Sequence, residues 1–483
     1  MTKSLDLHLE FDRSAGSPGR SLESALRESI RAGRLPAGSR LPGSRSLATD
    51  LGLARGTVVQ AYAQLVAEGW LVAAPGSGTR VAAVLHDPPG SRWQPRPSTA
   101  AGPVIELRPG IPDLGSFPRT AWVGSVRRAL ATASRGTLDY PEPAGLLVLR
   151  AAVTAYLART RGVLCAPDAV VITAGFTQGL SLVARTLHRR GVRAIATENP
   201  GLAPHRMVLR AAGLTVTPLT VGADGADPDD VTGQAALLTP AHQHPTGVVL
   251  SPGHRYRLIA WAREQDAFLI EDDYDGEFRY DQRPVGAMQA LAPERIVYAG
   301  STSKSLAPGI RLGWFVVPES LRRDLTTTIM EAGAAVSAID QLAMADLLAH
   351  GDYDRHIRRM RLTYRRRRIE LADRLAEVTP TPLEGIAAGM HALLPLASVA
   401  EERLLIQAGR RQGLHLIGLH SNGYWHDPAD ERQAAALVLG YAAPPAHAWQ
   451  QALSGLSQLV HQTGRELAHP LGPVGDTFDS CKP

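Results

Sequence analysis

Between Ser4 and Cys481 the chain has one lysine, Lys304, although lysine and arginine together number 51. Arginine supplies cationic charge elsewhere, so a single retained lysine suggests a reaction that a guanidinium cannot perform. A guanidinium stays protonated, whereas a buried lysine amine can lose its proton and attack a carbonyl carbon to form a Schiff base. We therefore predict a nucleophilic Lys304; the alternative is a surface residue left over in an arginine-rich chain.

The neighbourhood of Lys304 favours the nucleophile. GSTSKSLAPGIRLGW (300–314) directly follows a predicted strand, and loops at such strand ends are where α/β sheets bind ligands. Arg311 could reach back to an anionic group. Two serines could contact the same group, Ser301 and Ser303.

Two further segments predict the rest of a pyridoxal phosphate site. In ITAGFTQGL (172–180) a strand passes into a helix whose first amides favour phosphate, with contributions from Gly175, Phe176 and Thr177. In EDDYDGEFRY (271–280), Asp272 could keep a pyridinium nitrogen protonated, which makes the ring an electron sink. Tyr274 could hydrogen-bond a phenolate oxygen on that ring. Each feature alone is common in solvated loops and turns.

Short apolar runs predict the strands that position these segments. They alternate with helical patterns, which indicates a mostly parallel sheet covered on both faces. The predicted strands are 169–173, 193–197, 214–221, 235–240, 267–273, 295–301 and 311–317. From about Gly351 the pattern becomes helical and then mixed, which predicts a smaller C-terminal α/β subdomain. The arginine-rich run at 355–375 has helical period and predicts a solvated or subunit-contacting helix.

The first 82 residues predict a DNA-binding unit. A helix at 21–33 precedes one that Ser44 can cap, and a third helix begins near Ala54. On that third helix four residues would pack inward: Val58, Ala61, Tyr62 and Leu65. Its outward residues near the N-terminal end are Arg55, Thr57 and Gln60, where a recognition helix meets DNA. A two-stranded wing is predicted at 70–82, around Gly76 and Gly78, with Arg80 able to reach a phosphate; the alternative is a small helical bundle with a basic face.

Bulk composition is compatible with both units. The net charge is +5, and residues 20–80 hold eight arginines against four carboxylates. The only cysteines are Cys165 and Cys481, so we expect no disulfide framework. No signal peptide or membrane span is apparent, and a cytoplasmic location is expected. We predict the DNA-binding unit at 1–82, a Pro/Gly/Ser-rich linker at 83–104, a cofactor-binding unit at 105–470, a tail at 471–483 and no metal site.

The N-terminal segment resembles the winged helix-turn-helix of GntR-type bacterial regulators, in the pattern LPxSRxLAxxLGxxRxTVxxAYxxLxxEG. The resemblance implies DNA contacts at Ser44, Arg45, Arg55, Gly56, Thr57 and Arg80. Residues 105–445 resemble fold-type I aminotransferases, in which Lys304 would carry the cofactor and Tyr140 would reach the cofactor phosphate of the partner subunit. TPAHQHPTG (239–247) is a further match.

Together the two parts look like the MocR/GabR subfamily, through LRPGIPDLGSFPRTAW (107–122) and the segments around Asp272 and Lys304. That resemblance implies a head-to-tail, domain-swapped homodimer. Three positions depart from the aminotransferase pattern: His244 replaces an asparagine, Val438 replaces the arginine that binds a substrate carboxylate, and Leu202 lies near where an aromatic residue often stacks. Arg206 could take over the carboxylate contact.

The predicted function is transcriptional regulation through DNA binding, with pyridoxal phosphate as cofactor. A small amine or amino acid would be sensed by exchange of the aldimine at Lys304, with at most residual transaminase activity. Two alternatives remain: an active aminotransferase with an appended DNA-binding unit, and a sensor of pyridoxal phosphate itself.

Overall fold

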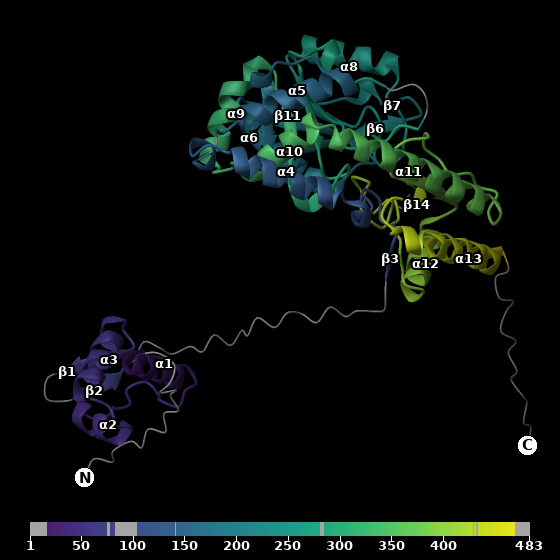
Figure 1. The fold of residues 1–483 in the computed structure, drawn as a ribbon. Helices are drawn as coiled ribbons and strands as arrows, with labels where there is room; N and C mark the ends of the chain where they lie inside the picture. Colours follow the sequence, from purple (N-terminus) through teal and green to yellow (C-terminus); the bar gives the residue numbers. More distant parts are fainter. Residues whose placement is uncertain are drawn as a thin grey trace, which may run out of the picture. The chain divides into compact units, whose positions relative to one another are not determined.

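The computed structural model describes residues 17–74, 78–82, 104–140, 142–280, 285–427, 429–430 and 433–468. The chain divides between Ala100 and Ala101 into two compact units, each with a hydrophobic core of its own (Figure 1). The expected linker, residues 83–104, lies outside the described residues except for its last residue. Gly76 of the predicted wing also lies outside them. In the described part, no helix is long and apolar enough to cross a membrane.

The N-terminal unit has three helices and a hairpin: α1 (Pro18–Arg31), α2 (Ser44–Leu51), α3 (Arg55–Ala67), β1 (Leu71–Ala74) and β2 (Gly78–Val81). The strands pair antiparallel, from Leu71 opposite Val81 to Ala74 opposite Gly78. Gly52 has a φ of 63°, which makes the tight turn between α2 and α3. The four α3 residues predicted to face inward are all buried: Val58, Ala61, Tyr62 and Leu65. The predicted helix-turn-helix is therefore confirmed.

Two details of this unit were predicted wrongly. The first helix begins at Pro18 and ends at Arg31 rather than spanning 21–33. The Ser44 side chain makes no capping hydrogen bond, because Gly43 occupies the N-cap position in extended conformation. The carbonyl of Gly43 accepts the helical bond from Leu47, so Ser44 already lies inside the helix.

The large unit is built on an eight-stranded mixed sheet in the order β4-β11-β10-β9-β8-β5-β6-β7. The strands are β4 (Val170–Thr173), β5 (Ala194–Asn199), β6 (Thr215–Gly222), β7 (Gly225–Ala226), β8 (Ala235–Leu238), β9 (Phe268–Asp272), β10 (Ile296–Ser301) and β11 (Gly313–Val316). Neighbours from β10 through β6 pair parallel, whereas β11 pairs antiparallel with β10 and β4. The predicted strands and mostly parallel sheet are confirmed.

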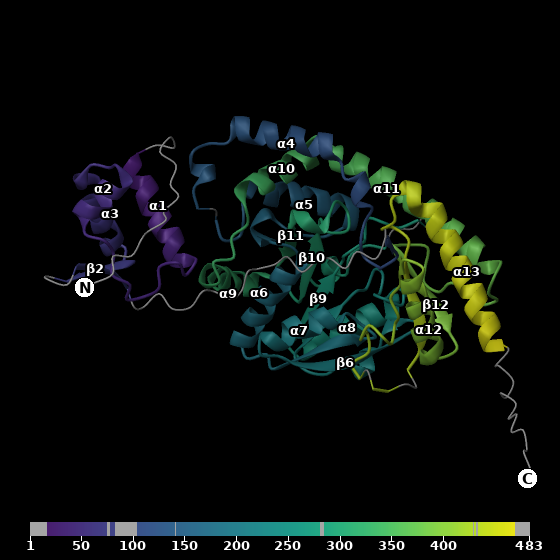
Figure 2. The ribbon, with the colours of Figure 1, turned by 90° about the horizontal axis from the view of Figure 1, so that it is seen from below.

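Helices cover both faces of this sheet (Figures 1 and 2). They are α4 (Arg119–Thr132), α5 (Leu147–Arg161), α6 (Phe176–Arg189), α7 (Ala203–Ala211), α8 (Pro252–Glu264), α9 (Glu319–Glu331) and α10 (Ala338–Ala349). Alternate residues of a strand enter different cores: Val171 packs with α6 and α9, whereas Ile172 packs with α5 and α10. Burial on both faces explains why the strands are apolar runs.

The long helix α11 (Asp352–Ala376) leads to the C-terminal subdomain. This subdomain contains β12 (His391–Leu396), α12 (Val399–Arg411), β13 (Leu414–His415), β14 (Ala435–Gly440) and α13 (Trp449–Ala468). A strand from early in the large unit, β3 (Ile105–Glu106), pairs parallel with β13. Arg367 on α11 is 1% exposed and forms an ion pair with Asp113. One face of this arginine-rich helix is therefore buried in its own chain, rather than all of it being solvated.

Candidate functional site

Lys304 lies in the turn after β10 and lines a cavity of about 290 Å³. Its amine donates a hydrogen bond to the carbonyl oxygen of Gly110 at 2.6 Å. Gly110 has a φ of 72°, and a β-carbon there would lie 3.0 Å from the lysine Nζ, so glycine provides the space for the amine. Burial lowers the pKa of Lys304 below its usual value, against the opposing charges of Asp272 and Asp275.

Asp272 lies in the same cavity, at the carboxyl end of β9 beside β10. It is 4% exposed, and burial raises its pKa well above the usual range, although the charge of Lys304 opposes this shift. Among the described residues no side chain hydrogen-bonds its carboxylate. A buried carboxylate without such a partner is costly, so the site fits a ligand that brings a protonated nitrogen.

The part of the cavity lining around Arg311 is suited to an anion. The helix α6 begins at Phe176 behind Gly175, which has a φ of 81°. Arg311 packs against Gly175, where a β-carbon would lie 3.1 Å from its guanidinium, and it donates to the carbonyl of Ala174 at 2.5 Å. Arg311 itself has a φ of 53°, which is uncommon outside glycine and is typical of functional sites. Three hydroxyl side chains line the same cavity: Thr177, Ser301 and Ser303.

The donors in this cavity match pyridoxal phosphate group by group. Arg311 and the first amides of α6 suit the phosphate, Lys304 suits the aldehyde and Asp272 suits the ring nitrogen. The structure thus brings together eight of the residues predicted from the sequence. They are Asp272, Tyr274, Phe176, Thr177, Ser301, Ser303, Lys304 and Arg311.

His205 is a cavity residue that the sequence analysis missed. Leu202 lines the cavity, as its position suggested, but so does His205 on the next turn of α7. The His205 ring lies 4.8 Å from the Phe176 ring, centre to centre, and burial lowers the pKa of His205 to about 4. His205 is therefore a neutral aromatic ring at neutral pH. Its three-residue offset from Leu202 could have identified it, because both positions share one helix face.

The remaining wall comes from the segment after β8 and from the C-terminal subdomain. His244 lines the cavity, and its ring contacts those of Tyr274 and Tyr424. Burial lowers the pKa of His244 well below its usual value. Val438 is fully buried in a core with Leu393 and does not line the cavity. Among the described lining residues, Arg311 is the only arginine.

Two predicted residues lie elsewhere. Arg206 is 5% exposed and donates to the carbonyl oxygens of four residues, Gly201, Gly423, Tyr424 and Trp425. Its guanidinium is therefore committed to holding the 423–425 segment, and the expectation that it binds an effector carboxylate is not supported. Tyr140 is 98% exposed and does not line its own chain's cavity. A contact with a partner subunit stays a prediction.

The predicted DNA-contacting residues lie on α2, α3 and β2 of the N-terminal unit; Ser44, on α2, is half-buried. Arg45 lies at the start of α2, and Arg55, Gly56 and Thr57 form the first turn of α3; all are exposed except Thr57, which is half-buried. Arg80 is exposed on β2 and donates to the Gly38 carbonyl at 2.9 Å. The DNA contacts themselves stay predictions.

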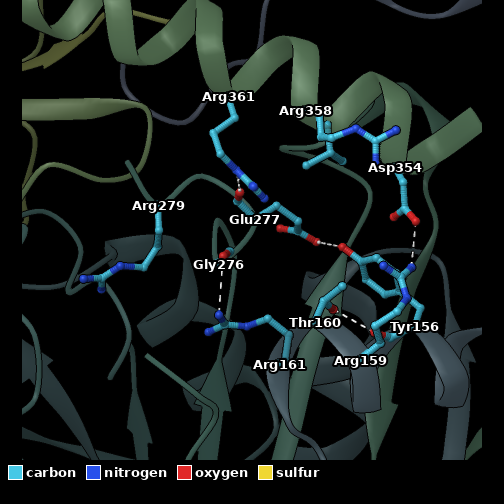
Figure 3. Close-up of a pocket in the computed structure, with 11 residues that line it drawn as sticks. Tyr156, Arg159, Thr160, Arg161, Gly276, Glu277, Arg279, Asp354, Arg358 and Arg361 are labelled. Carbon is cyan, nitrogen blue, oxygen red and sulfur yellow. Dashed lines mark hydrogen bonds and ion pairs between the residues drawn. The ribbon is translucent and has the colours of Figure 1, made fainter. Parts of the chain in front are cut away.

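A larger cavity of about 440 Å³ lies between α5, α11 and the turn after β9 (Figure 3). Five arginines line it, and four of them are engaged. Arg159 pairs with Asp354, Arg161 pairs with Asp273, and Arg361 and Arg279 donate to the carbonyls of Glu277 and Ala241. Because this cavity has no lysine among its lining residues and most of its arginines are engaged, the smaller cavity is the better candidate site.

Comparison with known proteins agrees with both parts of the chain. Residues 18–81 match the bacterial regulatory proteins of the gntR family, and residues 103–421 match aminotransferase class I and II. The pyridoxine biosynthesis transcriptional regulator PdxR of Corynebacterium glutamicum is 34% identical, over 91% of this chain and 95% of that protein. The probable rhizopine catabolism regulatory protein MocR of Rhizobium meliloti is also 34% identical, over 90% and 92%.

Solved structures show the same fold for the large unit. An archaeal alanine:glyoxylate aminotransferase superposes with a TM-score of 0.68 at 22% identity, covering 75% of this chain and 92% of that one. Kynurenine aminotransferase of Pyrococcus horikoshii gives a TM-score of 0.67 at 20% identity, covering 76% and 92%. The predicted fold class, a winged helix-turn-helix joined to a fold-type I aminotransferase-like domain, is confirmed.

Proposed function

This chain belongs to the MocR-type HTH transcriptional regulators, which join a GntR helix-turn-helix to an aminotransferase class I and II domain, and from this premise we propose its function. It binds DNA through residues 1–82 and holds pyridoxal phosphate at Lys304, where it senses a small amine or amino acid. One observation carries the proposal: a single cavity is lined by a lysine amine whose pKa burial lowers, a buried carboxylate and an arginine, which are Lys304, Asp272 and Arg311.

The residues divide the work of holding the coenzyme. Arg311, Thr177, Ser301 and the Gly175–Phe176 turn bind the phosphate. Asp272 keeps the ring nitrogen protonated, and Tyr274 lies beside it on the same loop. When bound, the coenzyme supplies an aldehyde that primary amines attack and a ring that withdraws electrons. Burial assists Lys304, because a lowered pKa leaves more of its amine unprotonated and nucleophilic.

Sensing follows from competition for one aldehyde. With the coenzyme held at Lys304, a primary amine would compete for its aldehyde and free the lysine amine, which donates to the Gly110 carbonyl in this structure. Gly110 follows β3, which pairs with β13 of the C-terminal subdomain. Release of Lys304 from the coenzyme would therefore change contacts of the segment around Gly110, which joins the sheet to the C-terminal subdomain. In a head-to-tail dimer, with Tyr140 reaching the partner's phosphate, this change would alter the spacing of the two DNA-binding units.

The test is covalent trapping. Borohydride reduction of the coenzyme-loaded protein should label one peptide, containing Lys304, and leave the terminal lysines Lys3 and Lys482 unlabelled. Lys304→Ala should remove both the label and the coenzyme absorbance. An unlabelled position 304 in the wild-type protein would contradict the proposal.

One alternative, sensing of pyridoxal phosphate itself, is favoured by a specific observation. Arg311 is the only arginine among the described lining residues, so an amino-acid carboxylate lacks a second cationic anchor. A relative named for pyridoxine biosynthesis points in the same direction. Footprinting with and without coenzyme, and with no amine added, distinguishes the two forms of sensing. Keto-acid release in a single turnover would instead favour an active aminotransferase.

A further inference from the structure

Three buried side chains meet behind the wall of the coenzyme cavity: His242, Asp275 and His391. They are 3%, 3% and 2% exposed, and one nitrogen or oxygen atom from each lies within 4.8 Å of the others. They come from the segment after β8, the turn after β9 and the first residue of β12. We propose that the two histidines bind a divalent transition metal ion, of which Zn²⁺ is the representative, and that Asp275 orients His242 for it.

The hydrogen bond of His391 fixes which ring nitrogen is free. Its Nε2 lies 3.2 Å from the carbonyl oxygen of Pro245. A carbonyl can only accept, so Nε2 carries the proton and Nδ1 carries a lone pair. That Nδ1 is buried and has no hydrogen-bond partner in the described part of the chain.

His242 shows the same arrangement with a carboxylate. Its Nδ1 lies 2.8 Å from Asp275 Oδ2 and 3.0 Å from the Tyr274 hydroxyl oxygen. Because an ionised carboxylate can only accept, Nδ1 carries the proton that both oxygens share, and Nε2 carries the lone pair. Nε2 is likewise buried and without a partner among the described atoms. Histidine ligands of metals usually donate their other N–H to a carboxylate or a backbone carbonyl, which fixes the ring orientation. His242 donates to the carboxylate of Asp275, and His391 donates to the carbonyl of Pro245.

The donor set selects the class of ion. Imidazole ligands suit zinc and its neighbours, whereas magnesium and calcium prefer oxygen alone. Zinc ligands lie about 2.0–2.2 Å from the ion, so two of them are at most about 4.4 Å apart. The His242 and His391 ring centres lie 5.0 Å apart, so small side-chain rotations can bring one nitrogen of each to a single ion. A third position could go to His244, whose ring lies 4.6 Å from that of His391 and whose Nδ1 is also buried without a partner among the described atoms.

The backbone before β12 is shaped to reach this cluster. A β-carbon on Gly389 would lie 2.2 Å from His242 Cε1 and 2.5 Å from Asp275 Oδ2. Glycine at 389 therefore lets β12 bring His391 against the other two side chains. An ion there would join the C-terminal subdomain to the sheet. The sequence suggested no metal site, because the three residues of the cluster lie on segments that are far apart in the chain.

The experiment uses full-length, tag-free protein stripped with a chelator, exposed to Zn²⁺ and then desalted. Elemental analysis should find about one zinc per chain. Asp275→Asn should weaken binding by about 10–100-fold, as expected for a group that orients a ligand. His391→Asn should abolish retention. Co²⁺ in place of Zn²⁺ should give visible absorption bands, a readout that requires no variant and no coenzyme.

The matched control is His356→Asn. His356 is also buried, and its Nε2 lies 2.8 Å from the Ser305 carbonyl, but it is outside the cluster. This variant should retain zinc in full. Retention below about 0.1 zinc per wild-type chain, or equal retention in folded Asp275→Asn, would overturn the proposal. If His391→Asn fails to fold, Asp275→Asn and the cobalt spectrum decide.

Discussion

Arg206 and Lys304 are both basic residues near the coenzyme cavity, but their surroundings differ. Lys304 makes one hydrogen bond, to a carbonyl, from inside an open cavity. Arg206 donates to four carbonyls and is withdrawn from solvent. Lys304, with a single hydrogen-bond partner, can react with a ligand or bind one. Arg206, whose donors already have acceptors in the protein, holds the fold together.

This difference predicts the effect of Arg206→Met. The substitution keeps the apolar stem but leaves buried carbonyls without donors, so we expect a loss of about 2–4 kcal/mol in the free energy of unfolding of the large unit. Coenzyme affinity per folded molecule should change little. Denaturant unfolding and an absorbance titration measure the two quantities. Arg210→Met, at an exposed position on the same helix, is the control. A selective loss of amino-acid binding would instead revive an effector role for Arg206.

At the scale of elements, apolar runs and turn residues predicted the sheet and the helix-turn-helix because both are determined locally. Asp272 and Lys304 could be placed in one site, since parallel strands β9 and β10 end at the same edge. The hydrogen bonds of Arg206 to the 423–425 segment and the cluster of His242, Asp275 and His391 could not be predicted, because each depends on how the C-terminal subdomain packs on the sheet. Ser44 was misplaced by one residue, an error typical of helix boundaries.

Three carboxyl groups near the coenzyme edge of the sheet predict a pH dependence. Burial raises the pKa of Glu198, Glu271 and Glu277 to about 7 each. Between about 4.5 and about 7 the folded state then binds more protons than the unfolded state, so stability falls as pH rises. Glu198→Gln should reduce that slope by up to about 1.4 kcal/mol per pH unit.

Unfolding of the coenzyme-free protein at several pH values across this window measures the slope. Glu264→Gln, at an exposed position on α8, should leave the slope unchanged. Equal slopes for wild type and Glu198→Gln would show that Glu198 is ionised in the folded protein throughout.

The first turn of α3 predicts a salt-dependent contact with DNA. If Arg55 neutralises a phosphate, Arg55→Gln should weaken binding to all sequences and reduce the slope of log K against log salt by about 0.9. Arg27→Gln removes the same charge from a residue already paired with Glu23 and Glu68, and should leave the slope nearly unchanged. Fluorescence anisotropy at several salt concentrations measures both; an unaltered slope in Arg55→Gln would place that residue off the DNA.

At the scale of the whole molecule, the DNA-binding unit and the large unit have separate cores, so ligand binding in one does not by itself alter the other. Regulation by an effector then requires a coupling free energy, and coupling is reciprocal. If an amine changes operator affinity by some factor, typically about 5–150-fold, operator DNA must change amine affinity by the same factor. Sensing of the coenzyme would obey the same rule with coenzyme in place of amine.

The reciprocity can be measured with the full chain and with residues 104–468 alone. Without DNA, the two proteins should bind coenzyme and amine equally, because the cavity is built entirely from the large unit. With saturating operator DNA, only the full chain should show a shifted amine affinity, and by the factor that the amine imposes on DNA binding. Equal amine affinity in the presence and absence of operator, with DNA bound throughout, would mean that the aminotransferase-like unit binds its ligand without controlling the DNA-binding unit.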